Sequence, residues 1–268
     1  MSGLFQSERP RLDDVMDTFD VLPQLVKMSA SLGLPEHDCV ILGEGNTSAR
    51  AGETSYWIKA SGMHLHQIQP SGFVELRFAP VLALLELQEA SDEQVKQVLA
   101  EAKIDPTAVL RPSIEATMHA VIYDLCDAQF IGHTHPTAVN AVLCAREYQV
   151  VLAGRLFPDH IVFCGLEPAF VPYVDPGLPL ARQVRQTLCD YLDRFGEAPK
   201  TIYMQNHGLI ALGKTANEVE NITLMSVKAC RVLLGSAGFG GPRFLTEAET
   251  HRIYTRPDEL YRRQQAGM

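Results

Sequence analysis

The chain has 268 residues, 46% of them hydrophobic and 21% charged, and a formal net charge of −9 at pH 7. A chain of this length can bury a large core without disulfides or structural metals, so a bound metal is expected to serve chemistry. The acidic balance, without a cluster of lysine and arginine, argues against nucleic acid or an anionic membrane as the main partner.

The cysteines and the N-terminal segment predict a cytoplasmic protein. Six cysteines are scattered without a C-x-x-C pair, and most lie in apolar segments such as IVFCG, as expected of reduced thiols. Charged residues from Glu8 to Asp14 precede any apolar run, which argues against a signal peptide. No stretch approaches the roughly 18 uncharged apolar residues of a membrane span, so no membrane partner is expected.

The spacing of apolar residues predicts helices and strands in alternation, although not in a strict βαβ order. Helices are predicted over residues 17–33, 90–103, 111–125, 136–146, 180–196 and 215–235, with one or two more between 245 and 261. Strands are predicted over residues 37–45, 54–62, 128–135, 159–165 and 169–174, and two more within 200–214. Adjacent strands in the second half imply some antiparallel pairing, so we expect one mixed sheet with helices on its faces.

No linker is long or polar enough to divide the chain. We therefore expect a single domain over residues 1–268, with a core at about 20–235 and a helical C-terminal tail at 245–268. Two helix starts carry the capping-box pattern, Ser91 with Gln94 and Thr215 with Glu218.

Two histidines, His133 and His135, flank one threonine at the end of a predicted strand. Side chains two apart on a strand point the same way, so the two rings can converge on one metal ion. The alternative is a pair of hydrogen-bonded histidines at a strand end. A second pair, His64 and His66, follows no clear strand, so a third donor must discriminate between the pairs. His207, between two predicted strands, is the candidate third donor, although alone it reads as a turn residue.

Glu115 is the candidate acid. With Ser113 as the predicted N-cap, Glu115 lies in the first turn of its helix, where the helix dipole favours a carboxylate. Taken alone, this position is explained by helix stabilisation. His119 lies one turn further along and shares the same face.

The segment LGEGNTSAR at residues 42–50 reads as a glycine-rich turn. Ser48 stands where the third glycine of a dinucleotide fingerprint belongs and no helix clearly follows, which disfavours a nicotinamide-dependent oxidoreductase. Backbone N–H groups here, with Asn46 and Thr47, could instead form a nest for an anion. The segment KASG at residues 59–62 adds a cation, a hydroxyl and a flexible glycine, although each feature is also typical of an ordinary turn.

In this order, these motifs resemble the class II aldolase/adducin family, over roughly residues 20–235. The family includes fuculose- and rhamnulose-phosphate aldolases, ribulose-phosphate 4-epimerases, a methylthioribulose-phosphate dehydratase and the non-enzymatic adducin head domain. The shared motifs are G-x-G-N-x-S at 43–48, S-G at 61–62, S-x-E with a later histidine at 113–119, H-x-H at 133–135 and N-H-G at 206–208.

The resemblance implies an α/β fold, a three-layer α/β/α sandwich with a central mixed, largely antiparallel sheet. It implies that His133, His135 and His207 bind Zn²⁺ or another divalent metal, and that Glu115 is the catalytic acid/base. It gives no ligand role to the second histidine pair, which we take as structural.

The resemblance also implies a phosphate pocket, to which the lysine of KASG is our own addition. The expected substrate-binding residues are Gly45, Asn46, Lys59, Ser61, Gly62 and Ser113. The implied assembly is a homo-oligomer, with a homotetramer favoured.

The expected function is metal-dependent aldol cleavage of a small, phosphorylated ketose through a metal-stabilised enediolate. Epimerisation, dehydration or decarboxylation of a sugar phosphate at the same site is the alternative, and a non-catalytic adducin-like scaffold is a further one. One departure bears on the reaction. Some family aldolases use a tyrosine from a neighbouring subunit, whereas the corresponding segment, AGRLFPDHIVF, has none, which leaves Asp159 or His160 as substitutes.

Overall fold

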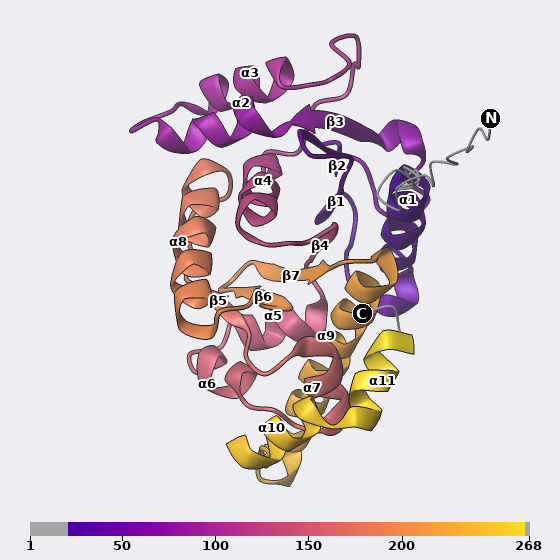
Figure 1. The fold of residues 1–268 in the computed structure, drawn as a ribbon, viewed down its shortest axis with the longest axis vertical. Coiled ribbons are helices and arrows are strands. Elements are labelled where there is room, and N and C mark those ends of the chain that lie inside the picture. Colours follow the sequence, from indigo (N-terminus) through magenta and orange to yellow (C-terminus); the bar gives the residue numbers. More distant parts are fainter. Residues whose placement is uncertain (1–20, 266–268) are drawn as a thin grey trace, which may run out of the picture.

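The computed structural model describes residues 21–265, so the N-terminal segment that bears on a signal peptide lies outside the described residues. Seven strands form one sheet in the order β3-β2-β1-β4-β7-β6-β5 (Figure 1). Their bounds are β1 Asn46–Arg50, β2 Ser55–Lys59, β3 Phe73–Arg77, β4 Phe130–Thr134, β5 Ala169–Val171, β6 Thr201–Met204 and β7 Gly208–Gly213. All neighbouring pairs are antiparallel except β5 with β6, so the expected mixed, largely antiparallel sheet is confirmed.

Helices cover both faces of this sheet. Their bounds are α1 Val21–Leu32, α2 Phe78–Ala83, α3 Asp92–Glu101, α4 Ala116–Leu125, α5 Thr137–Leu143, α6 Tyr148–Ala153, α7 Pro158–Cys164, α8 Leu178–Phe195, α9 Ala216–Ser236, α10 Glu247–Thr255 and α11 Pro257–Gln265. Alternate side chains of β7 point to opposite faces of the sheet and pack against the helices on each face. Ile210 and Leu212 join the apolar cluster under α4 and α8, whereas Leu209 and Ala211 join the clusters under α5, α9 and α1. This arrangement is the three-layer α/β/α sandwich.

Several local predictions are confirmed. Ser91 and Gln94 form the full capping box of α3. The Thr215 side chain accepts the Glu218 N–H at the start of α9. The C-terminal tail forms α10 and α11, the first with its own capping box between Thr246 and Glu249.

The predicted strand over residues 37–45 is wrong. The strand in this region is β1, which begins directly after that segment, at Asn46. Residues 37–45 form an irregular loop in which Leu42 adopts a left-handed φ of 53°. The next residues, NTSAR, are predicted to belong to a glycine-rich turn with polar hydroxyls, and that prediction is wrong too. In the folded chain their polar groups are paired inside the core, as with Thr47 Oγ1, 2.6 Å from Ser29 Oγ. Tertiary hydrogen bonding outweighs the local preference.

The predicted strand over residues 159–165 is also wrong, because this segment is helix α7. Its β-branched run Ile161–Val162 favours a strand by propensity. Pro158, however, stands at the first helical position and Asp159 in the first turn, both helix-start signals. The helix packs against α9, α10 and α11, which bury one side of it.

Helix α9 is long, with 21 residues. Within residues 21–265, Ala216–Phe239, which is α9 and its short 3₁₀ extension, is long and apolar enough to cross a membrane by length and composition. We expected no such stretch. Its Val219 and Ile222 are fully buried, and α9 packs on β4, β7, α1, α5 and α7. A core helix passes the same test, so length and composition alone are weak support for a span.

Candidate metal centre

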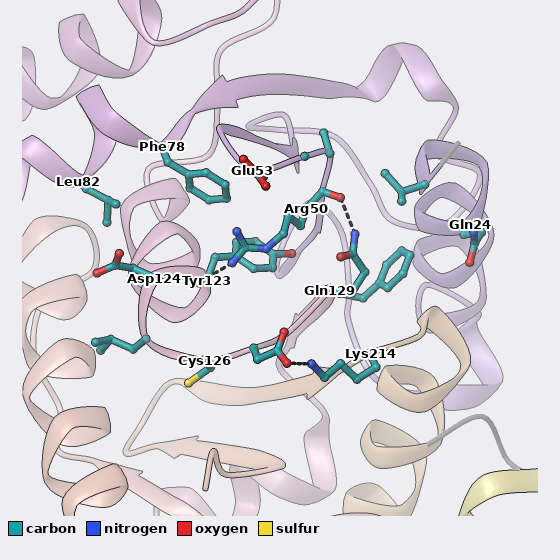
Figure 2. A pocket seen from close by; sticks show the side chains of 16 residues that line it. Gln24, Arg50, Glu53, Phe78, Leu82, Tyr123, Asp124, Cys126, Gln129 and Lys214 are labelled. Atoms are coloured by element: carbon teal, nitrogen blue, oxygen red, sulfur yellow. Dashed lines mark hydrogen bonds and ion pairs between the residues drawn. The ribbon is translucent and has the colours of Figure 1, made fainter. Parts of the chain in front are cut away.

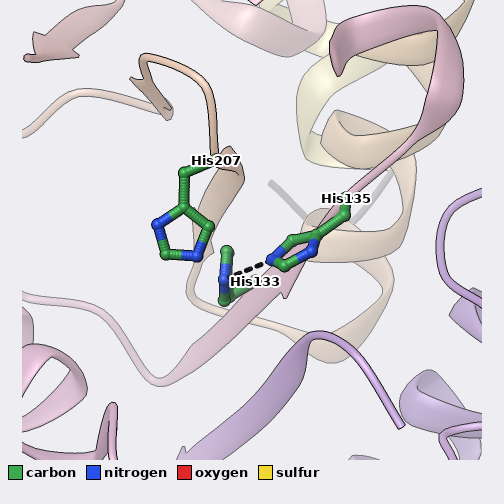
Figure 3. A group of neighbouring side chains, drawn as sticks. All are labelled: His133, His135 and His207. Atoms are coloured by element: carbon green, nitrogen blue, oxygen red, sulfur yellow. Dashed lines mark hydrogen bonds between the residues drawn. The ribbon is translucent and has the colours of Figure 1, made fainter. Parts of the chain in front are cut away.

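Three histidines meet at one end of the central strands. His133 lies on β4, His135 just beyond it, and His207 in the turn between β6 and β7 (Figure 3). The pairing of β4 with β7 sets His133 opposite Ile210, which brings the two chain segments together. The ligand nitrogens of the three histidines all lie within 4.8 Å of one another, so the group can hold a metal ion. His64 and His66 are exposed and outside this group.

The backbone around His207 explains the N-H-G motif. Asn206 adopts a left-handed φ of 52°, a conformation that asparagine tolerates better than most residues. A Cβ on Gly208 would lie 2.5 Å from the Thr134 carbonyl oxygen and 2.7 Å from Cδ2 of His135. Only glycine permits this close approach of β7 to the two ligand rings.

The histidine nitrogens are oriented for a metal. His133 Nδ1 lies 3.0 Å from the Leu209 carbonyl oxygen, so it carries the proton and leaves Nε2 with a free lone pair. His133 Nε2 and His135 Nε2 are 2.9 Å apart. Two ligands at ~2.0–2.1 Å from one ion, at angles of about 90–110°, lie ~3 Å apart. Burial lowers the pKa of His133 well below its usual range, against the opposing charge of Glu115, so the ring is neutral.

An outer carboxylate supports one ligand. Glu44 Oε2 lies 3.5 Å from His135 Nδ1, on the side of the ring away from His133. A carboxylate in this position fixes ring orientation and raises ligand basicity in metal sites. The sequence gives no signal for Glu44, because the loop before β1, with Leu42 in a left-handed conformation, is what brings its carboxylate to the His135 ring.

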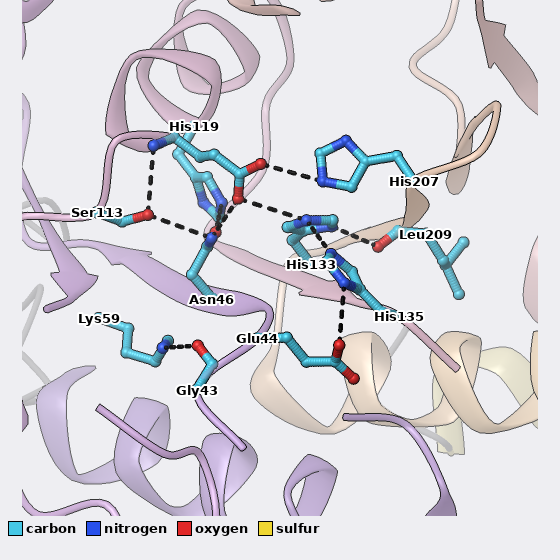
Figure 4. A network of polar contacts seen from close by, with 11 residues as sticks. Gly43, Glu44, Asn46, Lys59, Ser113, His119, His133, His135, His207 and Leu209 are labelled. Carbon is cyan, nitrogen blue, oxygen red and sulfur yellow. Dashed lines mark hydrogen bonds and ion pairs between the residues drawn. The ribbon is translucent and has the colours of Figure 1, made fainter. Parts of the chain in front are cut away.

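Glu115 faces two of the three histidines. Its Oε1 is 3.2 Å from His207 Nε2 and its Oε2 is 3.5 Å from His133 Nε2. Figure 4 shows both histidines together with Asn46, which belongs to the same polar network. Burial alone would raise the pKa of Glu115, but hydrogen bonds from His207 and the Asn46 amide favour the charged form, and its pKa lies below the usual range. The donor set is three imidazoles with one adjacent carboxylate, which fits a divalent ion such as zinc.

Ser113 does not cap its helix as expected. Glu115 itself occupies the N-cap position of α4, without a side-chain cap bond. The Ser113 hydroxyl instead accepts the Glu115 backbone N–H and one Asn46 amide hydrogen, each at 3.3 Å. The capping prediction is wrong because α4 begins at Ala116, so the serine supports the turn before the helix.

Only some of the residues predicted to bind a phosphate lie close to one another in the folded chain. Asn46, now on β1 rather than in a turn, donates to Glu115 at 2.6 Å. Lys59 is buried and donates to the carbonyl oxygens of Gly43 and Met63, and burial lowers its pKa to about 8 against the charge of Glu115. Ser61 and Gly62, at the end of β2, are exposed.

Gly45 links this region to the metal ligands. Its φ is +68°, and a Cβ there would lie 2.7 Å from the His133 carbonyl oxygen. Asp159 pairs with Arg262 at 2.9 Å and His160 is buried in α7, so neither reaches the histidine group within this subunit.

The sequence matches the family described as the class II aldolase and adducin N-terminal domain over residues 24–234. The chain belongs to this family. A search of curated proteins returned no match.

Solved structures share the class II aldolase fold. The N-terminal class II aldolase domain of a conserved Thermoplasma acidophilum protein is 22% identical, with TM-score 0.62 and coverage of 87% of this chain and 99% of that one. YgbL from Klebsiella pneumoniae, for which aldolase, epimerase and decarboxylase are alternative assignments, is 19% identical (TM-score 0.66; coverage 87% and 97%). L-fuculose 1-phosphate aldolase from Glaciozyma antarctica PI12 is 15% identical (TM-score 0.63; coverage 92% and 86%). At these identities the likeness shows the fold alone.

Two cavities flank the central strands of this class II aldolase domain. One, of about 420 Å³, opens beside His135 and Glu44 and is the space next to the candidate metal ligands. A larger one, of about 1210 Å³, lies at the far end of the same strands, where Arg50 and Tyr123 line it (Figure 2). The larger cavity does not include any of the histidine group, so volume alone does not mark the site.

Proposed function

We propose that this chain is a metal-dependent aldolase, which reversibly cleaves a carbon–carbon bond of a small, phosphorylated ketose. The observation that carries the proposal is the buried Glu115 carboxylate, 3.2 Å and 3.5 Å from nitrogens of His207 and His133. A metal site with a carboxylate beside it can stabilise an oxyanion and move a proton at the neighbouring carbon, which aldol cleavage requires.

In this proposal each residue has a role. His133, His135 and His207 would hold the divalent ion, for which zinc is our choice. When bound, the metal would supply a Lewis acid for a substrate oxygen. Glu115 would take up or return the proton through a carboxylate oxygen. Burial of His133 and Glu115 would keep water from the reacting atoms.

The anion pocket remains part of the proposal. Gly45, Asn46, Lys59, Ser61, Gly62 and Ser113 would bind the substrate phosphate. Lys59 already donates to two carbonyl oxygens, which leaves its third N–H and its positive charge for an anion. Asn46→Ala and Lys59→Ala should each raise KM for a phosphorylated ketose far more than for the free sugar. Equal effects on both substrates would mean that these residues are structural and that the substrate carries no phosphate.

The deciding experiment combines a metal assay with a substrate screen. The purified protein should contain about one divalent ion per chain by mass spectrometry of the dissolved metal. It should release dihydroxyacetone phosphate from at least one ketose phosphate, and a chelator should abolish the release. Epimer, dehydrated sugar or carbon dioxide as product would reassign the reaction to one of the alternatives. No metal and no turnover on any substrate would favour the scaffold.

We further propose a cytoplasmic homotetramer, since closed symmetric oligomers are the common soluble assemblies. Light scattering at micromolar concentration tests this, and a monomer would contradict it.

A further inference from the structure

A continuous buried hydrogen-bond chain leads away from Glu115 into the core. Asn46 Nδ2 lies 2.6 Å from Glu115 Oε2, and Asn46 Oδ1 lies 2.5 Å from His119 Nε2. His119 Nδ1 lies 2.7 Å from Ser48 Oγ, which lies 2.8 Å from the Tyr123 hydroxyl. Ser48 and His119 are fully buried, and the other three are at most 8% exposed. None of the roles assigned above uses His119, Ser48 or Tyr123.

The Asn46 amide fixes the direction of the bonds in this chain. Its nitrogen lies 2.6 Å from Glu115 Oε2 and 3.3 Å from Ser113 Oγ, so its oxygen faces His119, and an amide oxygen only accepts. His119 must then donate from Nε2. Burial lowers the pKa of His119 to about 4, against the charge of Glu115, so the ring is neutral and its Nδ1 must accept. Ser48 therefore donates to Nδ1 and accepts from the Tyr123 hydroxyl.

The reverse orientation is disfavoured from the Tyr123 end. Were His119 to carry its proton on Nδ1, Ser48 would accept from the ring and turn its own hydrogen to Tyr123. Within residues 21–265 the Tyr123 hydroxyl has Ser48 as its hydrogen-bond partner. The tyrosine hydrogen would then lose its acceptor inside the core, where an unmade hydrogen bond is costly.

We propose that His119 is a positioning residue, whose Nε2–H tautomer, set by Ser48 and Tyr123, fixes the Asn46 amide so that it holds Glu115 toward the candidate metal ligands. The effect on turnover rests on the proposed function, whereas the tautomer and the amide orientation do not. His119 touches neither the histidine group nor the space beside it, so it acts through Asn46. Loss of the Nε2 donor would leave the Asn46 oxygen without its hydrogen bond and would loosen the amide that holds the carboxylate.

The first test reads the tautomer directly and needs no substrate. Solid-state ¹⁵N NMR of the full chain, labelled on histidine and measured with and without zinc, should show His119 as the Nε2–H tautomer. Its signals are assigned by their loss in His119→Gln. The Tyr123→Phe variant should shift or broaden them. A proton on Nδ1 of His119 in the wild type would overturn the proposal, whether or not the protein proves to be an aldolase.

The second test separates positioning from packing by rescue. His119→Leu should lower kcat by about 10- to 100-fold, the range expected when a reacting group is misplaced, with zinc content near that of wild type. His119→Gln keeps an N–H donor near the Nε2 position and should recover part of the loss. Equal kcat for the two variants would contradict the proposal, since a purely structural role has no use for the donor.

A matched pair of tyrosines completes the design. Tyr123→Phe removes a hydroxyl of the chain, and we expect a several-fold loss of kcat. Tyr56→Phe removes a buried hydroxyl from the same aromatic cluster, but that hydroxyl donates to the Ala116 carbonyl oxygen and lies outside the chain. Its kcat should stay within about two-fold of wild type. The same kcat in both variants would overturn the role of Tyr123. If the wild type turns over no substrate, the proposed function fails while the tautomer result still decides the positioning role.

Discussion

The substitution Gly208→Ala tests how closely the metal ligands are packed against the backbone. The new Cβ would lie 2.5 Å from the Thr134 carbonyl oxygen, 2.7 Å from Cδ2 of His135 and 3.1 Å from Cε1 of His133. Ordinary contact begins at 3.4 Å, so β7 must move ~0.9 Å from the Thr134 carbonyl oxygen and ~0.7 Å from the His135 ring. Such overpacking costs roughly 1–3 kcal/mol of unfolding free energy.

The same displacement should weaken metal binding. Three nitrogens can share one ion only if each lies at ~2.0–2.1 Å from it. A ring moved by most of an ångström must either leave the ion or strain its neighbours. We therefore expect the affinity for zinc to fall by about 10- to 100-fold, the scale found when the support of a metal ligand is lost.

Two measurements separate the effects. Zinc affinity is obtained by competition with a chromophoric chelator, and unfolding free energy by urea titration of the metal-free chain. Gly235→Ala is the control, because a Cβ in that turn of α9 meets nothing within 4 Å. It should leave zinc affinity unchanged and stabilise the chain by ~0.5–1 kcal/mol. Wild-type zinc affinity in Gly208→Ala would refute the reasoning.

Other substitutions test single residues. His207→Ala should lower metal content and activity together while His64→Ala leaves both in place, and full occupancy in the His207 variant would contradict the ligand assignment. Glu115→Gln should keep the metal and lose about 10²-fold or more in rate, the usual scale for a general acid/base; near-normal turnover would reduce Glu115 to helix stabilisation. Burial, aided by the charge of Arg155, lowers the pKa of His160 from 6.5 to about 3. The unfolded chain therefore binds this proton first, and stability is lost as the pH falls from 6.5 toward 3. Between pH 7 and 5, metal-free wild type should lose about 2 kcal/mol more unfolding free energy than His160→Gln, and equal losses in urea titrations would contradict the assignment.

The histidines and Glu115 could be found from the sequence because their signals are local. An H-x-H pair at a strand end and a histidine beside a glycine turn each need only the period of a strand and the backbone freedom of glycine. The pairing of β4 with β7 brings His133, His135 and His207 together. The apolar pattern predicts some antiparallel pairing but does not say which strands are neighbours. The resemblance to a family supplied the rest.

The support of the site could not be predicted, because its partners are distant in the sequence. The sequence places His119 in the motif at 113–119 and on the same helix face as Glu115, whereas its side-chain bonds run to Asn46 and Ser48, over 70 residues away. β1 was misread for the same reason. Its polar side chains are unsuited to a strand in isolation and become suitable only when α1 and α4 supply hydrogen-bond partners. The strand propensity of a residue does not reflect hydrogen-bond partners that are distant in the sequence.

The register of the sheet connects the stability of the core to the chemistry of the site. Asn46 pairs with His133 across β1 and β4, and Ile131, two residues before His133, lies in the apolar cluster under α4 and α8. A slip of β4 by one residue would turn His133 to the opposite face and take Ile131 out of its cluster. The apolar alternation that selects the register therefore also directs His133 toward Glu115 and Asn46. Gly132 reinforces this choice, because a Cβ there would lie 2.7 Å from Val219 of α9, so a larger residue would not fit that face without a shift. The burial that holds the central strands together thus also places the candidate ligand His133.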